Sequence, residues 1–114
     1  MTLPARLKQP KVREPKQLRS PDHRKWVKEH ACCVPGCKTG LPNMEAAHVR
    51  TGTNGGMGIK PGDEWCISLC RYHHAIQHTR GEPEFERRFG INMKQLAIEF
   101  AKASPVLRNR RSRA

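Results

Sequence analysis

The sequence is poor in the residues that build a large apolar core. Of its 114 residues, 36% are hydrophobic and 5% are aromatic, whereas glycine and proline contribute nine residues each. A chain of this length accommodates one small domain with tails, and so thin a core often depends on a metal ion or on disulfides. No run of about 18 apolar residues is present, and no charged, apolar leader begins the chain. We therefore expect a cytosolic protein without a membrane span.

Acidic residues are also scarce, because 22 Lys and Arg stand against 10 Asp and Glu, for a net charge of +12. The excess lies at the two ends: residues 1–19 carry +5 and residues 104–114 carry +4, which leaves +3 for residues 20–103. We interpret 1–19 as a disordered basic arm, 20–103 as the folded domain and 104–114 as a disordered basic tail. Such tails can lie along a phosphate backbone; purely solubilising arms are the alternative.

Helix caps and breakers predict short elements. Ser20-Pro21-Asp22 is typical of a helix start, Gly90 ends a helix, and Asn92 can cap the next one until Ser104-Pro105 ends it. Residues 50–62 hold five glycines and a proline, which indicates a loop. The predicted helices cover about 21–30, 71–79, 82–89 and 93–103, and the predicted strands cover about 44–49 and 65–69.

Five cysteines are an odd number, which in a reducing compartment favours metal ligation or buried thiols over disulfides. Two close pairs, Cys32 with Cys37 and Cys70 with His73, have the spacing of a closed tetrahedral zinc site. We predict a structural Zn²⁺ there, because four protein ligands leave no open position for a substrate. Cys33 is an alternative to Cys32 as the first ligand. Cys66 lies in an apolar strand and is predicted to be a buried thiol.

His74 and His78 form a second group, because residues four apart on a helix project from one face. His73 points about 100° away from His74, so that one can join the zinc while its neighbour faces elsewhere. Two imidazoles without a third strong protein ligand suit a catalytic divalent ion, whose open positions take water and a phosphate oxygen. A solvated helix face with incidental histidines is the alternative.

Three motifs are specific when they are taken together. A strand ends in Ala47-His48-Val49, a loop reads Gly-Gly-Met-Gly-Ile-Lys up to Lys60, and residues 69–78 read LCRYHHAIQH. On these residues the chain resembles the HNH nucleases, in particular the phage and prophage branch similar to the phage recombination-enhancement nuclease. The resemblance runs from about Cys32 to His78. It implies an α+β fold with a zinc-stapled ββα-metal (His-Me finger) core and flanking helices, in the cytoplasm of a bacterial or phage-infected cell.

The resemblance also implies roles for single residues. His48 matches the general base that takes a proton from the attacking water, a task that suits a neutral imidazole. Asp63 matches an acidic residue that holds or orients His48 or the metal, and His74 and His78 match the ligands of Mg²⁺ or another divalent ion. The implied activity is hydrolysis of DNA phosphodiester bonds, by nicking or cutting duplex or single-stranded DNA as a monomer. The basic residues expected to contact phosphates around this site are Arg50, Lys60, Arg71 and Arg80.

Two positions depart from the family pattern. Ala47 stands where many members have a metal-binding His or Asp, and Glu45 can compensate because alternate strand residues share a face. Trp65 stands where the middle Asn of the family name usually lies, so that the orienting role passes to Asp63. These departures leave open a catalytically weak or inactive zinc-stapled nucleic-acid-binding module. A treble-clef-like adaptor that binds protein through the tails is a further alternative.

Overall fold

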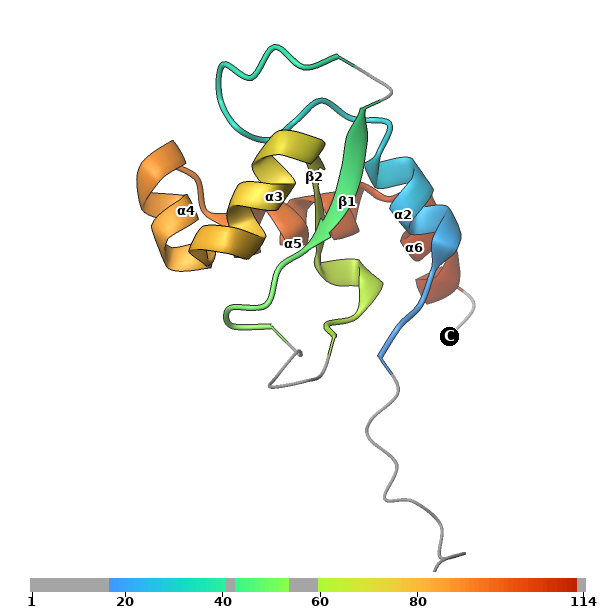
Figure 1. The fold of residues 1–114 in the computed structure, drawn as a ribbon. Coiled ribbons are helices and arrows are strands. Elements are labelled where there is room, and N and C mark those ends of the chain that lie inside the picture. The colour runs from blue at the N-terminus through green and yellow to red at the C-terminus, as the bar shows by residue number, and fades with distance from the viewer. Residues whose placement is uncertain (1–16, 41–42, 54–59, 113–114) are drawn as a thin grey trace, which may run out of the picture.

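Two antiparallel strands, β1 (Met44–His48) and β2 (Cys66–Cys70), lie at the centre of the α+β domain seen in the computed structural model (Figure 1). The structure describes residues 17–40, 43–53 and 60–112, with side chains up to Arg108. The predictions for residues 1–16 and for the Gly55–Gly58 part of the loop lie outside these ranges. Met44 pairs with Cys70 and His48 with Cys66, so the end of β1 lies beside the start of β2.

The helices begin and end at local signals that the sequence carries. They are α2 (Pro21–Val27), α3 (Arg71–Arg80), α4 (Glu82–Phe89), α5 (Met93–Ala103) and α6 (Pro105–Ser112), with a 3₁₀ turn η1 (Asp63–Trp65). The Ser20 side chain accepts from His23 N and caps α2, and the Asn92 side chain accepts from Gln95 N and caps α5. Gly90, with φ +68°, ends α4 in the left-handed conformation that glycine adopts without strain.

Helix α2 is shorter than the predicted span of 21–30. Its end tightens, because Glu29 N donates to Trp26 O and His30 N donates to Val27 O, each across three residues. The His30 ring nitrogen Nδ1 also lies 2.9 Å from Trp26 O. The His30 imidazole therefore bonds to the Trp26 carbonyl, which would accept a backbone N–H if the helix continued. None of the helices in the described part of the chain has the length and apolar character to cross a membrane.

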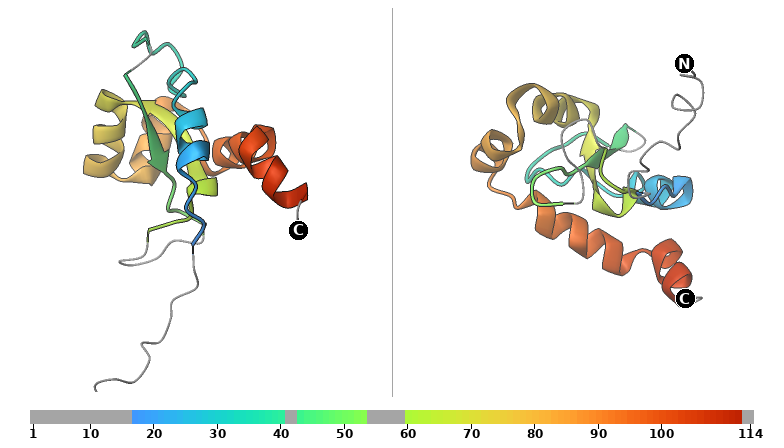
Figure 2. Two further views of the ribbon diagram at one scale, coloured as in Figure 1. Left: turned by 90° about the vertical axis from the view of Figure 1, so that its right-hand side faces the viewer. Right: turned by 90° about the horizontal axis from the view of Figure 1, so that it is seen from below.

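The core lies between the sheet and the helices. Strand β2 is buried along its whole length and contacts α2, α3 and α5. Helices α2 and α3 lie on opposite sides of the sheet, and α5 lies beside β2 (Figure 2). Apolar side chains from both strands meet those of α4 and α5 in one cluster that contains Val34, Ala47, Val49, Ile67, Leu69, Phe85, Met93 and Ala97. This core fixes the end of β1 and the start of α3, which carry the candidate site.

The prediction of a disordered tail from residue 104 is wrong for residues 105–112. These residues form α6, and Ser104 and Leu107 are buried. The Ser104 hydroxyl lies 2.8 Å from Nδ1 of the buried His23 on α2, and it accepts from Leu107 N. Ser104-Pro105 thus ends one helix and also begins the next, since serine is a good N-cap and proline a good first helical residue.

Candidate functional site

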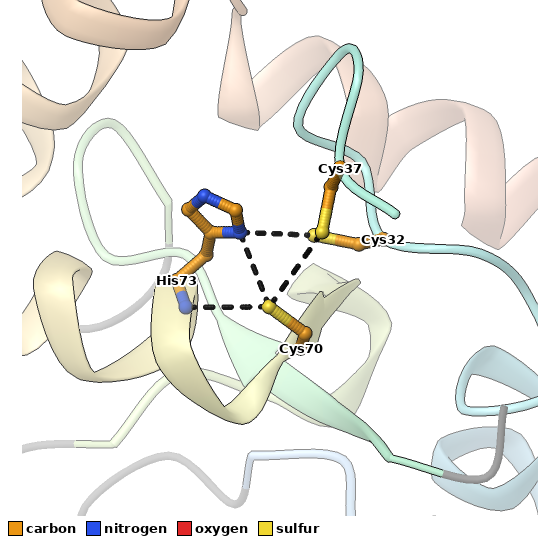
Figure 3. A group of neighbouring side chains, drawn as sticks. All are labelled: Cys32, Cys37, Cys70 and His73. Atoms are coloured by element: carbon orange, nitrogen blue, oxygen red, sulfur yellow. Dashed lines mark hydrogen bonds between the residues drawn. The ribbon is translucent and has the colours of Figure 1, made fainter. Parts of the chain in front are cut away.

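Four of the predicted ligands meet at one end of the sheet (Figure 3). Cys32 and Cys37 lie on the turn between α2 and β1, Cys70 ends β2, and His73 lies in the first turn of α3. Their ligand atoms all lie within 4.8 Å of one another. The cluster can therefore hold a metal ion such as zinc.

The distances within the cluster fit a tetrahedral ion. Cys37 Sγ lies 3.8 Å from Cys70 Sγ, and Cys32 Sγ lies 3.6 Å from His73 Nδ1. With Zn–S and Zn–N bonds of about 2.3 and 2.0–2.1 Å, tetrahedral geometry puts two sulfurs about 3.8 Å apart and a sulfur and a nitrogen about 3.6 Å apart. Only the 3.1 Å between Cys70 Sγ and His73 Nδ1, among the pairs with a measured distance, is shorter than this ideal.

Backbone hydrogen bonds tie the cysteine turn to the sheet. Cys33 N donates to Ser68 O on β2, and Cys37 N donates to Val34 O within the turn. The Cys33 thiol lies against the Ser68 hydroxyl at 3.6 Å and is not part of the cluster, so the structure places Cys32 there instead. Cys70 Sγ also accepts from His73 N and caps α3. The same sulfur therefore belongs to the cluster and starts the helix.

The thiols of the cluster differ in acidity. Burial raises the pKa of Cys32 to about 11. Hydrogen bonds from the Thr39 side chain and backbone lower the pKa of Cys37 below its ordinary value. Zinc binds thiolates, so binding to this cluster must displace a proton from Cys32 at neutral pH.

His48 and Asp63 form a hydrogen-bonded pair at the opposite end of β1. His48 Nε2 lies 2.8 Å from Asp63 Oδ1, and Asp63 is fully buried. The other carboxylate oxygen accepts from Ser20 N at 2.7 Å and from Arg24 Nε at 3.0 Å. Burial opposes ionisation of Asp63, but the hydrogen bonds from His48 and Ser20 and the charge of Arg24 lower its pKa below the ordinary value. Asp63 is therefore an anion at neutral pH.

The electrostatics of the pair leave His48 neutral. Burial lowers the pKa of His48 below its ordinary value, although the hydrogen bond and the charge of Asp63 act in the opposite direction. Because the Asp63 carboxylate only accepts, the proton of the neutral ring lies on Nε2. Nδ1 is then the basic nitrogen. A neutral imidazole of fixed tautomer is suited to accept a proton.

A buried acid at the start of α4, Glu82, holds the chain just after His48. Glu82 accepts from Arg50 N and Thr51 N, both at 2.8 Å, and from Gln77 Nε2 at 3.0 Å. Gln77 Nε2 also donates to His48 O at 2.9 Å. The acid at the start of α4 was visible as a favourable helix-start charge, but its contact with residues more than 30 positions earlier was not.

His74 and His78 face each other across one turn of α3. Their Nε2 atoms lie 3.1 Å apart, and His74 Nδ1 lies 2.7 Å from Glu45 Oε1 on β1. Two imidazole nitrogens bound to one ion at about 2.0–2.1 Å are separated by about 3.0–3.4 Å, so the pair can share an ion. A carboxylate on the second ring nitrogen is the usual way in which a metal-binding histidine is oriented.

The two positions that differ from the HNH pattern, Ala47 and Trp65, both contribute to the core or pack against it. Ala47 is fully buried in the core, and its methyl group offers no ligand atom. Glu45 reaches His74 instead. Trp65 packs against the core, and its carbonyl accepts from Val49 N at 2.8 Å. Asp63 contacts the His48 ring.

One open hollow of about 600 Å³ brings these groups together. Helix α2, strand β1 and helix α3 contribute to its walls. The charged and histidine side chains that line it are Arg24, Lys28, Glu45, His48, Arg50, Lys60, His74 and His78. Of the predicted phosphate contacts, Arg50 and Lys60 line this hollow, Arg71 lines a neighbouring one, and Arg80 at the end of α3 is exposed. Arg24 and Lys28 were not predicted, although their spacing of four residues places them on one face of a helix.

A further set of possible ligands is better explained as a hydrogen-bonded network. Atoms of His48, Asp63 and Cys66 lie within 4.8 Å of one another. Both oxygens of Asp63 already accept hydrogen bonds, and burial raises the pKa of Cys66 to about 12. Cys66 is fully buried, as predicted, and is a thiol rather than a ligand at neutral pH.

Comparison with known proteins places the chain in a family. Residues 4–105 match the family described as "Protein of unknown function (DUF968)". The chain belongs to this family. A similar protein is the "Uncharacterized protein YdfU" of Escherichia coli (strain K12), which is 32% identical over 87 residues. The alignment covers 68% of this DUF968 chain and 23% of YdfU, so the chain spans about a quarter of its curated relative. No solved structure matches it.

Proposed function

We propose that this DUF968 domain is a metal-dependent endonuclease of the HNH type, which hydrolyses phosphodiester bonds in DNA. The observation that carries the proposal is the shared hollow: His48, held by the buried Asp63, lines the same open space as His74 and His78. A base, a candidate metal pair and several cations converge there, as the hydrolysis of a phosphodiester requires.

The order of the elements supports the same proposal. Strands β1 and β2 are antiparallel, and α3 follows β2 without a connecting residue. This is the arrangement expected of a ββα-metal core, with the base at the end of the first strand and the metal pair on the helix. A zinc ion in the Cys32, Cys37, Cys70 and His73 cluster would be structural, since it would fix the start of α3 and thereby the position of His74.

The donor set of the second site fits a divalent cation. His74 and His78 would hold the ion, and Glu45 orients His74. Imidazole ligands favour Mn²⁺, Ni²⁺ or Zn²⁺ over Mg²⁺, which prefers oxygen ligands and keeps several waters. When bound, such an ion supplies Lewis-acid stabilisation of the charge that develops on the phosphate and on the leaving oxygen.

The side chains of the chain supply the remaining chemistry. Nδ1 of His48 takes a proton from the water that attacks phosphorus, and Asp63 stabilises the imidazolium that results. Arg50 and Lys60 hold phosphates of the strand in the hollow, and they position DNA without reading its bases. As the water oxygen bonds to phosphorus, the bond from phosphorus to the 3′ oxygen breaks and the 3′ oxygen takes a proton from solvent water. The products carry a 5′ phosphate and a 3′ hydroxyl.

The proposal is tested by relaxation of supercoiled plasmid. The protein is freed of loosely bound metal, checked for retained structural zinc, and assayed with Mg²⁺, Mn²⁺ and Ni²⁺ in turn. Wild-type protein should nick the plasmid, and His48→Ala should lower the rate by at least 10²-fold while DNA binding persists. Equal rates for the two proteins, or no nicking with any of the metals, would exclude the hydrolytic function and leave nucleic-acid binding as the alternative.

A further inference from the structure

Tyr72 has an exposed aromatic ring beside the proposed active site. It is the chain's single tyrosine, and among the large hydrophobic residues of the described part it alone is exposed, with 65% of its surface accessible. The ring takes no part in the core although the chain has few aromatic residues to spare. Tyr72 lies in the first turn of α3, two residues before His74.

The ring lines a second open hollow that adjoins the first. This hollow has a volume of about 680 Å³, and Arg71 and Tyr72 form part of its wall. Met44 and Glu45 line both this hollow and the one that contains His48. A strand that passes His48 can therefore continue over β1 to Tyr72 without leaving the hollowed surface.

The Tyr72 ring contacts one residue of the cysteine-histidine cluster, His73. The Tyr72 ring packs edge-on against His73, with the ring centres 5.1 Å apart and the planes at 71°. His73 in turn packs against Phe89 at 5.0 Å and belongs to the cysteine-histidine cluster. The helix start that carries the ring is thus fixed by the same four residues that can hold zinc. A fixed, exposed ring has little freedom to lose when another ring stacks on it.

The charge around the ring selects a nucleic acid over an apolar partner. Arg71 is almost fully exposed, and its Nε lies 3.8 Å from Glu45 Oε2. The adjoining hollow adds four further cations, Arg24, Lys28, Arg50 and Lys60. An aromatic ring next to cations that can follow a phosphate backbone is the usual composition of a surface that binds single strands.

We propose that Tyr72 and Arg71 form a subsite for an unpaired nucleotide of the substrate strand. The base stacks on the Tyr72 ring, and the phosphate of that nucleotide lies against Arg71. A base in a duplex has both faces covered by its neighbours, so the subsite favours a single strand or an unpaired end over intact duplex. This inference rests on the proposed nuclease function, because it takes the strand in the His48 hollow to be the strand that reaches Tyr72.

The subsite is tested by binding, in a His48→Ala background that leaves the strand intact. Anisotropy of a labelled single-stranded oligonucleotide is measured for Tyr72→Ala, Tyr72→Leu and Tyr72→Phe. Tyr72→Ala should weaken binding by about five- to hundredfold, as loss of one stacked base does. Tyr72→Phe should bind like the parent, because the ring rather than the hydroxyl stacks, and Tyr72→Leu should fall between. Duplex binding should change less than twofold. An equal loss for single strand and duplex, or no loss for either, would overturn the subsite.

A photochemical measurement separates this inference from the nuclease proposal. A single strand that carries 5-iodouracil should crosslink to Tyr72 in the His48→Ala protein, and the crosslinked peptide should be identified by mass spectrometry. Arg71→Gln should reduce the crosslink, whereas Arg87→Gln on the exposed face of α4 serves as the matched control. Crosslinking without hydrolysis by the wild type would contradict the nuclease and retain the subsite. Hydrolysis with neither a Tyr72 crosslink nor a Tyr72→Ala effect would contradict the subsite alone.

Discussion

Asp63 and Arg24 are joined by a hydrogen bond of 3.0 Å between a buried carboxylate and a guanidinium that lines the candidate site. The two residues are 39 positions apart in the chain. Through the same carboxylate, Arg24 on α2 is connected to His48 on β1, at 2.8 Å. The position of the candidate base therefore depends on a helix that lies outside the ββα unit.

Arg24 and Lys28 are predicted to separate stability from DNA binding. Arg24→Gln removes a hydrogen bond to a buried carboxylate and should lower the free energy of unfolding by about 1–2 kcal/mol. Lys28→Gln removes a cation from the same hollow without touching Asp63 and should leave stability within about 0.5 kcal/mol of wild type. In each variant, the plot of the logarithm of the DNA association constant against the logarithm of the salt concentration should become less steep by about one. Urea unfolding and salt titrations of DNA binding measure the two effects, and a Lys28→Gln variant as unstable as Arg24→Gln would contradict the assignment.

The cysteine-histidine cluster is predicted to be required for folding. Cys70→Ser keeps a good helix N-cap but removes a soft ligand, so any loss of stability reports the metal rather than the cap. We expect this variant to lose the bound zinc. Its free energy of unfolding should fall by more than about 5 kcal/mol, which is comparable to the whole stability of a small domain. Cys33→Ser is the matched control, because its sulfur lies outside the cluster. Metal analysis measures the zinc content of both variants, and thermal unfolding measures their stability. Full zinc content in Cys70→Ser would refute the four-ligand site.

Low pH is predicted to destabilise the fold through two buried histidines, His48 and His23. Burial lowers the pKa of both imidazoles, and the charge of Asp63 opposes the shift in each. The unfolded chain therefore binds protons that the native state does not, and stability falls as pH drops below the unfolded pKa of about 6.5. Unfolding measured between pH 7.5 and 5 should show this slope, and His23→Leu should flatten it. A stability that is constant over this range would contradict the buried, neutral state of both rings.

The rate of hydrolysis should also fall as the pH drops. The proposed hydrolysis needs a neutral His48, and burial lowers the pKa of this residue. The rate at pH 6.5, where an ordinary histidine is half protonated, should therefore exceed half of its plateau value, and it should fall at lower pH. Asp63→Asn removes the anion that stabilises the imidazolium and should lower the rate without abolishing DNA binding. A rate that already halves at pH 7 or above would show that another group is the base.

Helix α6 is predicted to contribute to stability although its sequence is strongly basic. Leu107 is 5% exposed, so Leu107→Ala should cost about 2–3 kcal/mol. Arg108→Ala, the next residue on an exposed position, should cost less than about 0.5 kcal/mol. Deletion of residues 105–114 should destabilise at least as much as Leu107→Ala. A deletion that leaves the unfolding midpoint unchanged would restore the interpretation of this segment as a tail.

Local signals explain why much of the fold was predictable. The Ser20 and Asn92 caps, the Gly90 stop and the close cysteine pairs each act over a few residues, and the structure places a helix boundary or a cluster at each. Ser104-Pro105 was misinterpreted because one dipeptide can both end a helix and begin another. An arginine-rich stretch with a single buried leucine has too little apolar pattern to reveal a helix.

The candidate site depends on contacts that span many residues, and these explain what the sequence left hidden. Glu45 and His74 are 29 positions apart, and Glu82 and Arg50 are 32 apart. Such pairs follow from the antiparallel register of β1 and β2 and from the packing of α3 and α4, which no short motif encodes. The residues of these two pairs were visible in the sequence, whereas the contacts between them were not.

We propose that His48 activates water for a cleavage in which the 3′ oxygen leaves. The most direct measurement treats supercoiled plasmid with wild-type protein and Mn²⁺, removes the protein, and adds DNA ligase. Wild type should produce nicked circles that ligase reseals, since hydrolysis leaves a 5′ phosphate and a 3′ hydroxyl, and His48→Ala should produce none at the same concentration. Nicked circles in equal yield from His48→Ala, or nicks that ligase does not reseal, would contradict the claim.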